Sequence, residues 1–356
     1  MRPKFHALKI KEVQSETEDT VSISFEIPSE LKSDYKYIAG QYFTLRTDIN
    51  GEDIRRSYSL CSSPTENEWR VAIKRVENGK FSTFATSSLS SGDVLEVMTP
   101  AGNFTFTPDS ARVNSYALFA AGSGITPIIS IVKSILENEP DSNVTLFYGN
   151  KQIQSVIFKE EIEGLKNEYM SSFRVVHILS RENLGAPILN GRIDLQKTNQ
   201  LFDSFLAESI PDHVYICGPE EMIHSVKDAM LTKGVKLENI HFELFTTSAV
   251  EAKKPVEADN APKVESNVSV IIDGDTFKLH LESNGENILD AASKTGADLP
   301  FACKGGVCCT CKAKILEGSA SMDVNYALEA DEVEAGYILT CQAHPTSDKL
   351  VVSFDD

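Results

Sequence analysis

The sequence lacks any long apolar run. No stretch among its 356 residues approaches the roughly 18 uninterrupted apolar residues that a membrane-spanning helix needs. The first six residues, Met1 to His6, also lack the apolar core of a signal peptide. From these two absences we expect a soluble, cytoplasmic protein with no membrane span.

Basic residues are scarce as well. Lys and Arg number 34 against 52 Asp and Glu, which gives a net charge of −18. Such a chain repels a phosphate backbone, which argues against nucleic acid as a partner and favours a basic protein surface. The charge is uneven, because residues 267–356 hold 15 acidic and 6 basic residues, a net charge of −9.

Cysteine is almost absent from the first 300 residues, where only Cys61 and Cys217 occur. The other five of the seven cysteines lie between residues 303 and 341. An odd total and a tight cluster, in a chain expected in the cytoplasm, favour metal or redox chemistry over a disulfide framework.

The remaining composition is that of a globular protein, and the length predicts about two to three domains. Short alternating runs broken by turn residues such as Asn50-Gly51 predict an antiparallel β-barrel domain over residues 1–109. Its expected strands include 21–27, 41–46, 69–76 and 94–98, with one helix over 80–89.

From residue 116 the pattern changes to strands that alternate with helices, which predicts an α/β domain with a parallel sheet over residues 110–246. The expected strands are 116–121, 143–148, 173–179, 214–217 and 240–245, and the expected helices are 126–138, 158–169 and 220–231. Residues 247–266 contain no aromatic residue and no periodic pattern, which predicts a flexible linker before a third domain over 267–356.

The strongest motif is the cysteine run in the third domain. Its C-x4-C-x2-C spacing, with a distant fourth cysteine, is typical of plant-type [2Fe-2S] sites and selects four ligands: Cys303, Cys308, Cys311 and Cys341. Gly305 and Gly306 remove side chains where backbone N–H groups must approach the sulfides. Cys309 falls outside the spacing and is not expected to bind. The alternative, a zinc knuckle, needs two CxxC pairs or added histidines, and His344 is the one nearby candidate.

Two further motifs lie in the barrel domain. Arg56-Ser57-Tyr58-Ser59 falls on an extended segment, and Gly79-Lys80-Phe81-Ser82 precedes the expected helix, whose N-terminus offers amide donors to an anion. Taken alone, the first motif also suits a solvated strand edge formed by Arg55 and Arg56, with Tyr58 covering a core.

Two motifs follow strands of the α/β domain. Residues 121–127, Ala-Gly-Ser-Gly-Ile-Thr-Pro, open a helix directly after a strand, where glycines let the backbone approach a pyrophosphate. Cys217-Gly218-Pro219 follows a later strand. In isolation the first is also consistent with a packed strand-to-helix turn, and the second with a core cysteine.

In this order the motifs resemble the ferredoxin-NADP reductase superfamily joined to a C-terminal plant-type ferredoxin, over nearly all of the chain. The resemblance implies a barrel that binds FAD, an α/β domain that binds NADPH, and a β-grasp ferredoxin domain that holds the [2Fe-2S] cluster. Residues 299–303, Leu-Pro-Phe-Ala-Cys, and 339–342, Leu-Thr-Cys-Gln, carry the likeness to the ferredoxin fold.

The resemblance also implies roles for residues around the flavin. Arg56 neutralises the pyrophosphate, Tyr58 packs on the isoalloxazine ring, and the Ser59 hydroxyl reaches the N5 region. Further flavin contacts are implied for a loop and for a residue beside Gly40: Gly79, Phe81, Ser82 and Gln41. The family has proline at the position of Ala39, so this chain departs from its P-G-Q pattern there.

For the nucleotide, the resemblance implies one binding loop and one motif beside the nicotinamide: Gly122, Gly124, Ile125, Thr126 and Pro127 in the loop, then Cys217, Gly218 and Pro219. Ser180 and Arg181 follow a strand where a 2′-phosphate would bind, and Lys151 could add a second cation. Glu243 and Phe245 correspond to an acidic residue and an aromatic residue that stacks near the flavin. Ser59, Cys217 and Glu243 would then form the polar catalytic set around hydride transfer.

The implied function is a reductase that passes electrons from NADPH through FAD and the cluster to the oxygenase component of a multicomponent monooxygenase. Two C-terminal segments, 326–333 and 336–345, further resemble the reductase components of diiron epoxidases. Two alternatives remain open at this point. One is a reductase for a Rieske oxygenase, a steroid hydroxylase or a fatty-acid desaturase, and the other is a cluster-bearing redox sensor without enzymatic activity.

Overall fold

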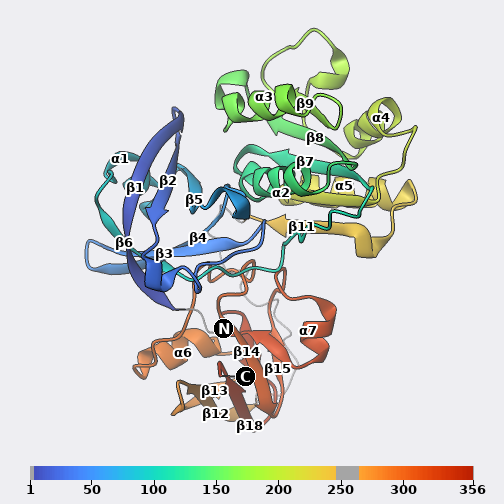
Figure 1. The fold of residues 1–356 in the computed structure, drawn as a ribbon. Helices are drawn as coiled ribbons and strands as arrows, with labels where there is room; N and C mark the ends of the chain where they lie inside the picture. The colour runs from blue at the N-terminus through green and yellow to red at the C-terminus, as the bar shows by residue number, and fades with distance from the viewer. Residues whose placement is uncertain (1–3, 246–263, 356) are drawn as a thin grey trace.

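The computed structural model describes residues 4–245 and 264–355, which form three bodies (Figure 1). Residues 247–263 of the expected linker, 247–266, lie outside the described residues. Its last two residues were wrongly assigned, because Glu265 and Ser266 belong to strand β12. No helix within the described ranges is long and apolar enough to cross a membrane.

The first body is an antiparallel barrel with strand order β4-β3-β6-β1-β2-β5. An antiparallel bridge between Leu60 and Val71 joins the two end strands and closes it. The interior is filled by buried apolar side chains such as Leu8, Phe43 and Val97. The elements are β1 (Phe5–Thr17), β2 (Thr20–Glu26), β3 (Tyr42–Ile49), β4 (Glu52–Ser59), β5 (Arg70–Lys74), α1 (Lys80–Ser87) and β6 (Val94–Met98).

The expected strands and helix of the barrel are confirmed, with ends that differ by up to three residues. The turn at Asn50-Gly51 is also confirmed, since both residues have positive φ, 57° and 81°, between β3 and β4. Strand β1 was not predicted. Most of its 13 residues are exposed or half-buried, so it lacks a strong apolar signal.

The second body is a parallel sheet with strand order β11-β10-β7-β8-β9 and helices on both faces. Helices α2 and α3 cover one face, and α4 and α5 cover the other. The elements are β7 (Ser115–Ala121), α2 (Ile125–Asn138), β8 (Asn143–Asn150), α3 (Lys159–Glu168), β9 (Phe173–Leu179), α4 (Leu195–Phe205), β10 (His213–Gly218), α5 (Glu220–Thr232) and β11 (Ile240–Leu244). All of these were expected except α4.

Helix α2 joins the first two bodies. Every residue from Ile125 to Leu136 is buried, because one side of the helix faces the parallel sheet and the other faces the barrel. The Ser130 hydroxyl donates to the carbonyl of Ser62 at 2.6 Å. The buried ammonium of Lys133 forms ion pairs with Glu66, at 3.0 Å, and with Glu161. Barrel and sheet are therefore held as one unit by polar as well as apolar contacts.

The third body has a mixed five-stranded sheet, order β13-β12-β18-β14-β16, and a two-stranded sheet, β15-β17. Its core lies between the larger sheet and α6, which agrees with the expected β-grasp fold. The elements are β12 (Glu265–Ile272), β13 (Asp275–Glu282), α6 (Ile288–Lys294), β14 (Lys312–Glu317), β15 (Ala320–Met322), α7 (Ala330–Glu334), β16 (Tyr337–Leu339), β17 (Ala343–Pro345) and β18 (Lys349–Ser353). This body lies below the other two in Figure 1.

Candidate functional site

Strand β4 carries the first motif of the barrel. Arg56 is exposed, and Tyr58, two positions on, is half-buried with its ring 5.6 Å from the ring of buried Phe81. Burial raises the pKa of the Tyr58 hydroxyl, so it stays neutral. An exposed guanidinium and a supported ring, two positions apart on one strand, suit a pyrophosphate and a flat ring system.

The glycine before α1 is required by the structure. A Cβ on Gly79 would lie 2.4 Å from the Ser82 hydroxyl oxygen, which accepts from the N–H of Val76 at 3.1 Å. Ser82 is 5% exposed and Phe81 1%, so both stabilise the start of the helix from inside. The expected anion donors at this position are the first N–H groups of α1, which have no partner within the helix.

Gln41 and Phe245 lie at the edges of this region. The Gln41 side-chain oxygen accepts from the N–H of Ile38 at 2.9 Å, which orients the half-buried amide. Gly40 beside it has φ 96°, and a Cβ there would lie 2.0 Å from the carbonyl oxygen of Phe104. Phe245, half-buried, follows the last residue of β11 and packs against the core between α2 and the sheet.

The three expected catalytic residues converge where barrel and sheet meet. The Ser59 hydroxyl, from β4, donates to Glu243 Oε2 at 3.4 Å. Glu243 and Cys217 are register partners in the parallel pair β10–β11. Burial raises the pKa of the Glu243 carboxyl to about 8, although the bond from Ser59 partly opposes the shift. A neutral acid, a hydroxyl and a buried thiol thus share one corner.

The glycine-rich loop after β7 is shaped by close backbone contact. A Cβ on Gly124 would lie 2.2 Å from the carbonyl oxygen of Cys217. A Cβ on Gly122 would have no atom within 4 Å, but the φ of Gly122 is 55°, a backbone conformation that favours glycine. The expected nucleotide contacts Ile125, Thr126 and Pro127 are buried, and the Thr126 hydroxyl donates to the carbonyl of Ser123. The accessible surface of the loop therefore comes from the half-buried residues 121–123.

The second motif of the α/β domain follows β10. A Cβ on Gly218 would lie 2.5 Å from the Met222 methyl carbon, and Pro219 precedes helix α5. Because parallel strands end at one edge, this turn lies beside the Gly122 loop.

Ser180 and Arg181 follow β9 at the same edge. Their N–H groups donate to the carbonyls of Asn150 and Lys151, both at 2.9 Å, so the two segments run together. Ser180, Arg181 and Lys151 are exposed. Two cations and a hydroxyl at the carboxyl end of a parallel sheet suit a phosphate group.

The cysteine loop runs from α6 to β14, and the fourth cysteine follows β16. The four thiols form two pairs, with Cys308 Sγ 3.1 Å from Cys303 Sγ and Cys311 hydrogen-bonded with Cys341. Within residues 4–245 and 264–355, no group of three His, Cys, Asp or Glu side chains could hold a single metal ion. Two thiol pairs suit two irons rather than one zinc, so the donor set fits a [2Fe-2S] cluster.

Backbone and side-chain donors surround these sulfurs. The N–H of Gly305 donates to Cys303 Sγ at 3.3 Å, and the Gln342 amide donates to Cys341 Sγ at 3.7 Å. Gly306 has φ 73°, and a Cβ there would lie 2.9 Å from a Val324 methyl carbon. The hydrogen bond from Cys308 is the largest cause that lowers the pKa of the Cys303 thiol, to about 6. In each thiol pair one pKa is lowered, at Cys303 and Cys341, and its partner's pKa is raised, at Cys308 and Cys311.

Cys309 faces the barrel instead. It interacts with the hydroxyl of Tyr42, and burial raises the pKa of its thiol to about 11. Tyr42 Oη lies 3.2 Å from Thr310 Oγ1, and its ring packs with Ala302 and Cys308. No sequence pattern indicated the contact between Tyr42 and Thr310, because the residues are 268 positions apart and the cysteine spacing does not show what its intervening residues contact.

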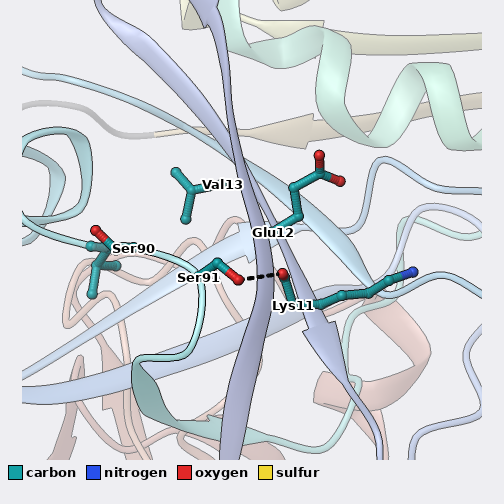
Figure 2. Close-up of a pocket in the computed structure, with 6 residues that line it drawn as sticks. Lys11, Glu12, Val13, Ser90 and Ser91 are labelled. Carbon is teal, nitrogen blue, oxygen red and sulfur yellow. Dashed lines mark hydrogen bonds between the residues drawn. The ribbon is translucent and has the colours of Figure 1, made fainter.

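Arg55 is a second barrel residue whose contacts the sequence did not indicate. The alternative of a solvated edge formed by Arg55 and Arg56 is wrong for Arg55, which is 3% exposed and donates to Asp298 and to the carbonyl of Leu299. A surface hollow lined by residues 11–13 and 89–91 contains none of the motif residues (Figure 2).

Barrel, parallel sheet and cysteine loop therefore define the class of protein: an oxidoreductase that carries electrons from a nicotinamide nucleotide through a flavin to a [2Fe-2S] cluster. Family models match all three parts: "Oxidoreductase FAD-binding domain" over residues 7–106, "Oxidoreductase NAD-binding domain" over 118–228 and "2Fe-2S iron-sulfur cluster binding domain" over 270–346.

The chain belongs to the family of ferredoxin-reductase-type proteins that includes one subunit of the 1,2-phenylacetyl-CoA epoxidase of Escherichia coli (strain K12). It is 42% identical to that subunit over 351 residues, which cover 99% of this chain and 98% of the relative. It is also 35% identical to the ferredoxin reductase component of 3-ketosteroid-9-alpha-monooxygenase from Rhodococcus rhodochrous, over 98% of this chain and 96% of the relative. Among solved structures, phthalate dioxygenase reductase matches with a TM-score of 0.60 and 26% identity, over 98% of each chain.

Proposed function

We propose that this chain is the NADPH-dependent reductase component of a diiron oxygenase that epoxidises phenylacetyl-CoA. The observation that supports the acceptor is the 42% identity to the Escherichia coli epoxidase subunit over almost the full length of both chains. The proposal places the protein in the cytoplasm, where the thiols that bind a cluster stay reduced.

The three groups that the domains bind differ in how many electrons each transfers in one step. Nicotinamide donates two electrons as a hydride, a [2Fe-2S] cluster carries one, and a flavin can exchange either. The domains that bind these groups follow one another along this chain, with FAD, nicotinamide nucleotide and cluster in that order.

In the proposal, this chain's own residues bind and orient these groups. Arg56 neutralises the flavin pyrophosphate, and Tyr58, with Phe81 behind it, supports the ring system. Ser59 donates to Glu243 and so links barrel and sheet where flavin and nicotinamide would meet. Cys217, buried at the end of β10, forms the wall next to Glu243 and restricts water there.

The nucleotide is proposed to lie across the carboxyl edge of the parallel sheet. Its pyrophosphate would contact the accessible part of the loop at Gly122, and its 2′-phosphate would contact Ser180, Arg181 and Lys151. Since these three residues are exposed and NADH lacks the 2′-phosphate, we propose that the enzyme prefers NADPH.

The acidic C-terminal domain is proposed to bind the oxygenase through a basic patch on that partner. The net charge of −9 over residues 267–356 makes such a surface the expected complement. Exposed charges are screened as the Debye length falls from about 10 Å at 0.1 M salt to about 3 Å at 1 M.

The test is NADPH-dependent epoxidation of phenylacetyl-CoA by the oxygenase subunits with this protein added, over a salt series. We expect turnover that slows with salt, while reduction of the protein's own flavin by NADPH does not follow the same salt dependence. Turnover that is indifferent to salt contradicts the electrostatic docking, and no turnover at any salt contradicts the acceptor.

The second candidate acceptor is a steroid hydroxylase, favoured by the 35% identity to the Rhodococcus rhodochrous reductase component over 98% of this chain. Efficient reduction of that oxygenase, with no epoxidation of phenylacetyl-CoA, would establish it instead. A redox sensor without enzymatic activity would show no bleaching of flavin or cluster absorbance on addition of NADPH.

A further inference from the structure

Arg55 and Arg56 are neighbours in sequence but face different environments. Arg56 is exposed, whereas Arg55 is 3% exposed and is covered by the cluster domain, to which it donates hydrogen bonds. Because side chains alternate along a strand, β4 presents one arginine to the proposed flavin site and the other away from it. The flavin motif explains Arg56 and leaves a buried guanidinium without a role.

The Arg55 guanidinium is held from both sides of the domain boundary. On the barrel side, Nε and Nη2 donate to Asp53 Oδ2 at 3.1 and 2.8 Å. On the cluster side, Nη2 donates to Asp298 Oδ1 at 3.0 Å and Nη1 donates to the carbonyl of Leu299 at 3.1 Å. Its Cζ also lies 4.3 Å from the centre of the Phe301 ring.

The segment that Arg55 contacts leads directly into the cluster loop. Asp298, Leu299 and Phe301 are followed by Ala302 and by Cys303, the first expected ligand. Ala302 and the second ligand of this pair, Cys308, pack on Tyr42. Arg55 therefore contacts the segment that leads into the loop, while Tyr42 contacts the loop at its start, Ala302, and in its later part, at Cys308 and Thr310.

Both barrel residues lie next to expected flavin contacts. Arg55 precedes Arg56, and Tyr42 follows Gln41. Gly102 leaves room for Tyr42, since a Cβ there would lie 3.0 Å from two carbons of its ring. Strand β4, and the start of β3 together with the residue before it, thus combine expected flavin contacts with contacts to the cluster domain.

We propose that Arg55 is a positioning residue that locks the cluster domain against the flavin-binding barrel, in the arrangement in which one electron at a time passes from reduced flavin to oxidised cluster. In this step the flavin is oxidised and the cluster reduced by one electron, no covalent bond forms between them, and any flavin proton goes to solvent. The inference rests on the proposed electron path, but the lock itself is a property of the chain.

The contacts of Arg55 differ in how much each contributes to docking of the cluster domain. Asp298 is 78% exposed, and exposed ion pairs contribute little, so Asp298→Ala is expected to weaken docking about two- to fivefold. Arg55→Gln removes the buried donors to Leu299 and the contact with Phe301, so we expect it to weaken docking at least about tenfold. Arg55→Lys retains the charge but not the planar fork and should fall between these two.

Arg46→Gln is the matched control. Arg46, on β3, donates to the same Asp53, at 3.0 Å, and pairs with Glu96 on the barrel. In the described residues it has no hydrogen bond or ion pair to the cluster domain. Its loss removes the same charge beside the same carboxylate, and its direct partners lie on the barrel, so the cluster domain loses only a through-space attraction between Arg46 and Asp298.

Two readouts on the full chain test the lock. Small-angle X-ray scattering of the isolated protein, without nucleotide or oxygenase, should give a larger radius of gyration for Arg55→Gln and for Asp298→Ala than for wild type and Arg46→Gln. Stopped-flow absorbance with NADPH should show cluster reduction slowed at least about fivefold in Arg55→Gln, with flavin reduction within about twofold of wild type.

If both interface variants scatter as wild type does and reduce the cluster at its rate, the lock is refuted. Equal slowing of flavin and cluster reduction also refutes it, because a general structural defect would explain that result. If Arg55→Gln fails to fold, Asp298→Ala decides alone, since its exposed site does not threaten the core. A change in scattering with no electron transfer in wild type would contradict the proposed function and leave the lock supported.

Discussion

The contact between Gly124 and Cys217 gives a prediction whose size follows from the coordinates. An alanine Cβ at position 124 would lie 2.2 Å from the carbonyl oxygen of Cys217, 2.6 Å from its carbonyl carbon and 3.0 Å from the N of Gly218. These are backbone atoms, so no side-chain rotation relieves the overlap. Because such contacts rarely fall below about 3.0 Å, loop and strand end must separate by about 0.8 Å.

Overpacking of this kind costs about 1–3 kcal/mol of stability. A displacement near 1 Å between the loop and Cys217 also costs about 100-fold in rate where reacting groups must meet. We therefore expect Gly124→Ala to lower kcat/KM for NADPH-dependent flavin reduction about 100-fold, while the barrel retains its flavin. Stopped-flow flavin bleaching and flavin content measure the two effects.

Gly164→Ala is the control. Gly164 lies exposed within α3, and nothing lies within 4 Å of a Cβ there. The same chemical change should stabilise the protein by up to about 1 kcal/mol, with normal kinetics. Wild-type flavin reduction in Gly124→Ala, or equal effects of the two substitutions, would refute the role of this close contact.

Three further predictions concern single side chains. Cys309→Ser should keep the rhombic paramagnetic signal of the reduced cluster, and Cys308→Ser should lose or strongly alter it; the reverse result contradicts the ligand assignment. Arg181→Ala should lower kcat/KM for NADPH about tenfold and leave kcat/KM for NADH unchanged. Tenfold corresponds to the low end of the free energy of a charge-assisted hydrogen bond, because Arg181 is exposed. Equal loss with both nucleotides contradicts the 2′-phosphate contact. Burial raises the pKa of the Glu243 carboxyl from 4.5 to about 8 in the native state. Between these two pH values the native state binds more protons than the unfolded state, so the free energy of unfolding falls as pH rises from about 4.5 to 8. Glu243→Gln should reduce that slope, which is at most about 1.4 kcal/mol per pH unit for one proton, and an unchanged slope in thermal or urea unfolding contradicts the shift.

Local patterns predicted the elements whose burial repeats along the sequence. The strand over 173–179 coincides with β9, and the glycine-rich run fell at the start of α2 as expected. The cysteine spacing selected four thiols, and the fold brings these four together as two pairs. Helix α4 was missed, because two of its four buried positions, Lys197 and Thr198, are polar and so interrupt the apolar pattern of the buried face.

Contacts between domains could not be predicted in this way. The side chain of Arg55 has the same sequence neighbours whether it faces solvent or Leu299, 244 residues away. The apolar surface of α2 indicated a helix but not that its other side would bury Lys133 against the barrel. Such choices depend on how folded domains pack, which short-range periodicity does not encode.

The electron path through the chain is tested most directly by one anaerobic titration of the intact protein, holding flavin and cluster, with NADPH. Flavin bleaching is followed by absorbance and cluster reduction by electron paramagnetic resonance. Since flavin accepts two electrons, the cluster one, and NADPH donates two, complete reduction requires about 1.5 equivalents of NADPH. We predict flavin bleaching together with a rhombic cluster signal. Flavin bleaching at about 1.0 equivalent with a cluster that stays oxidised, under excess NADPH, would contradict this path.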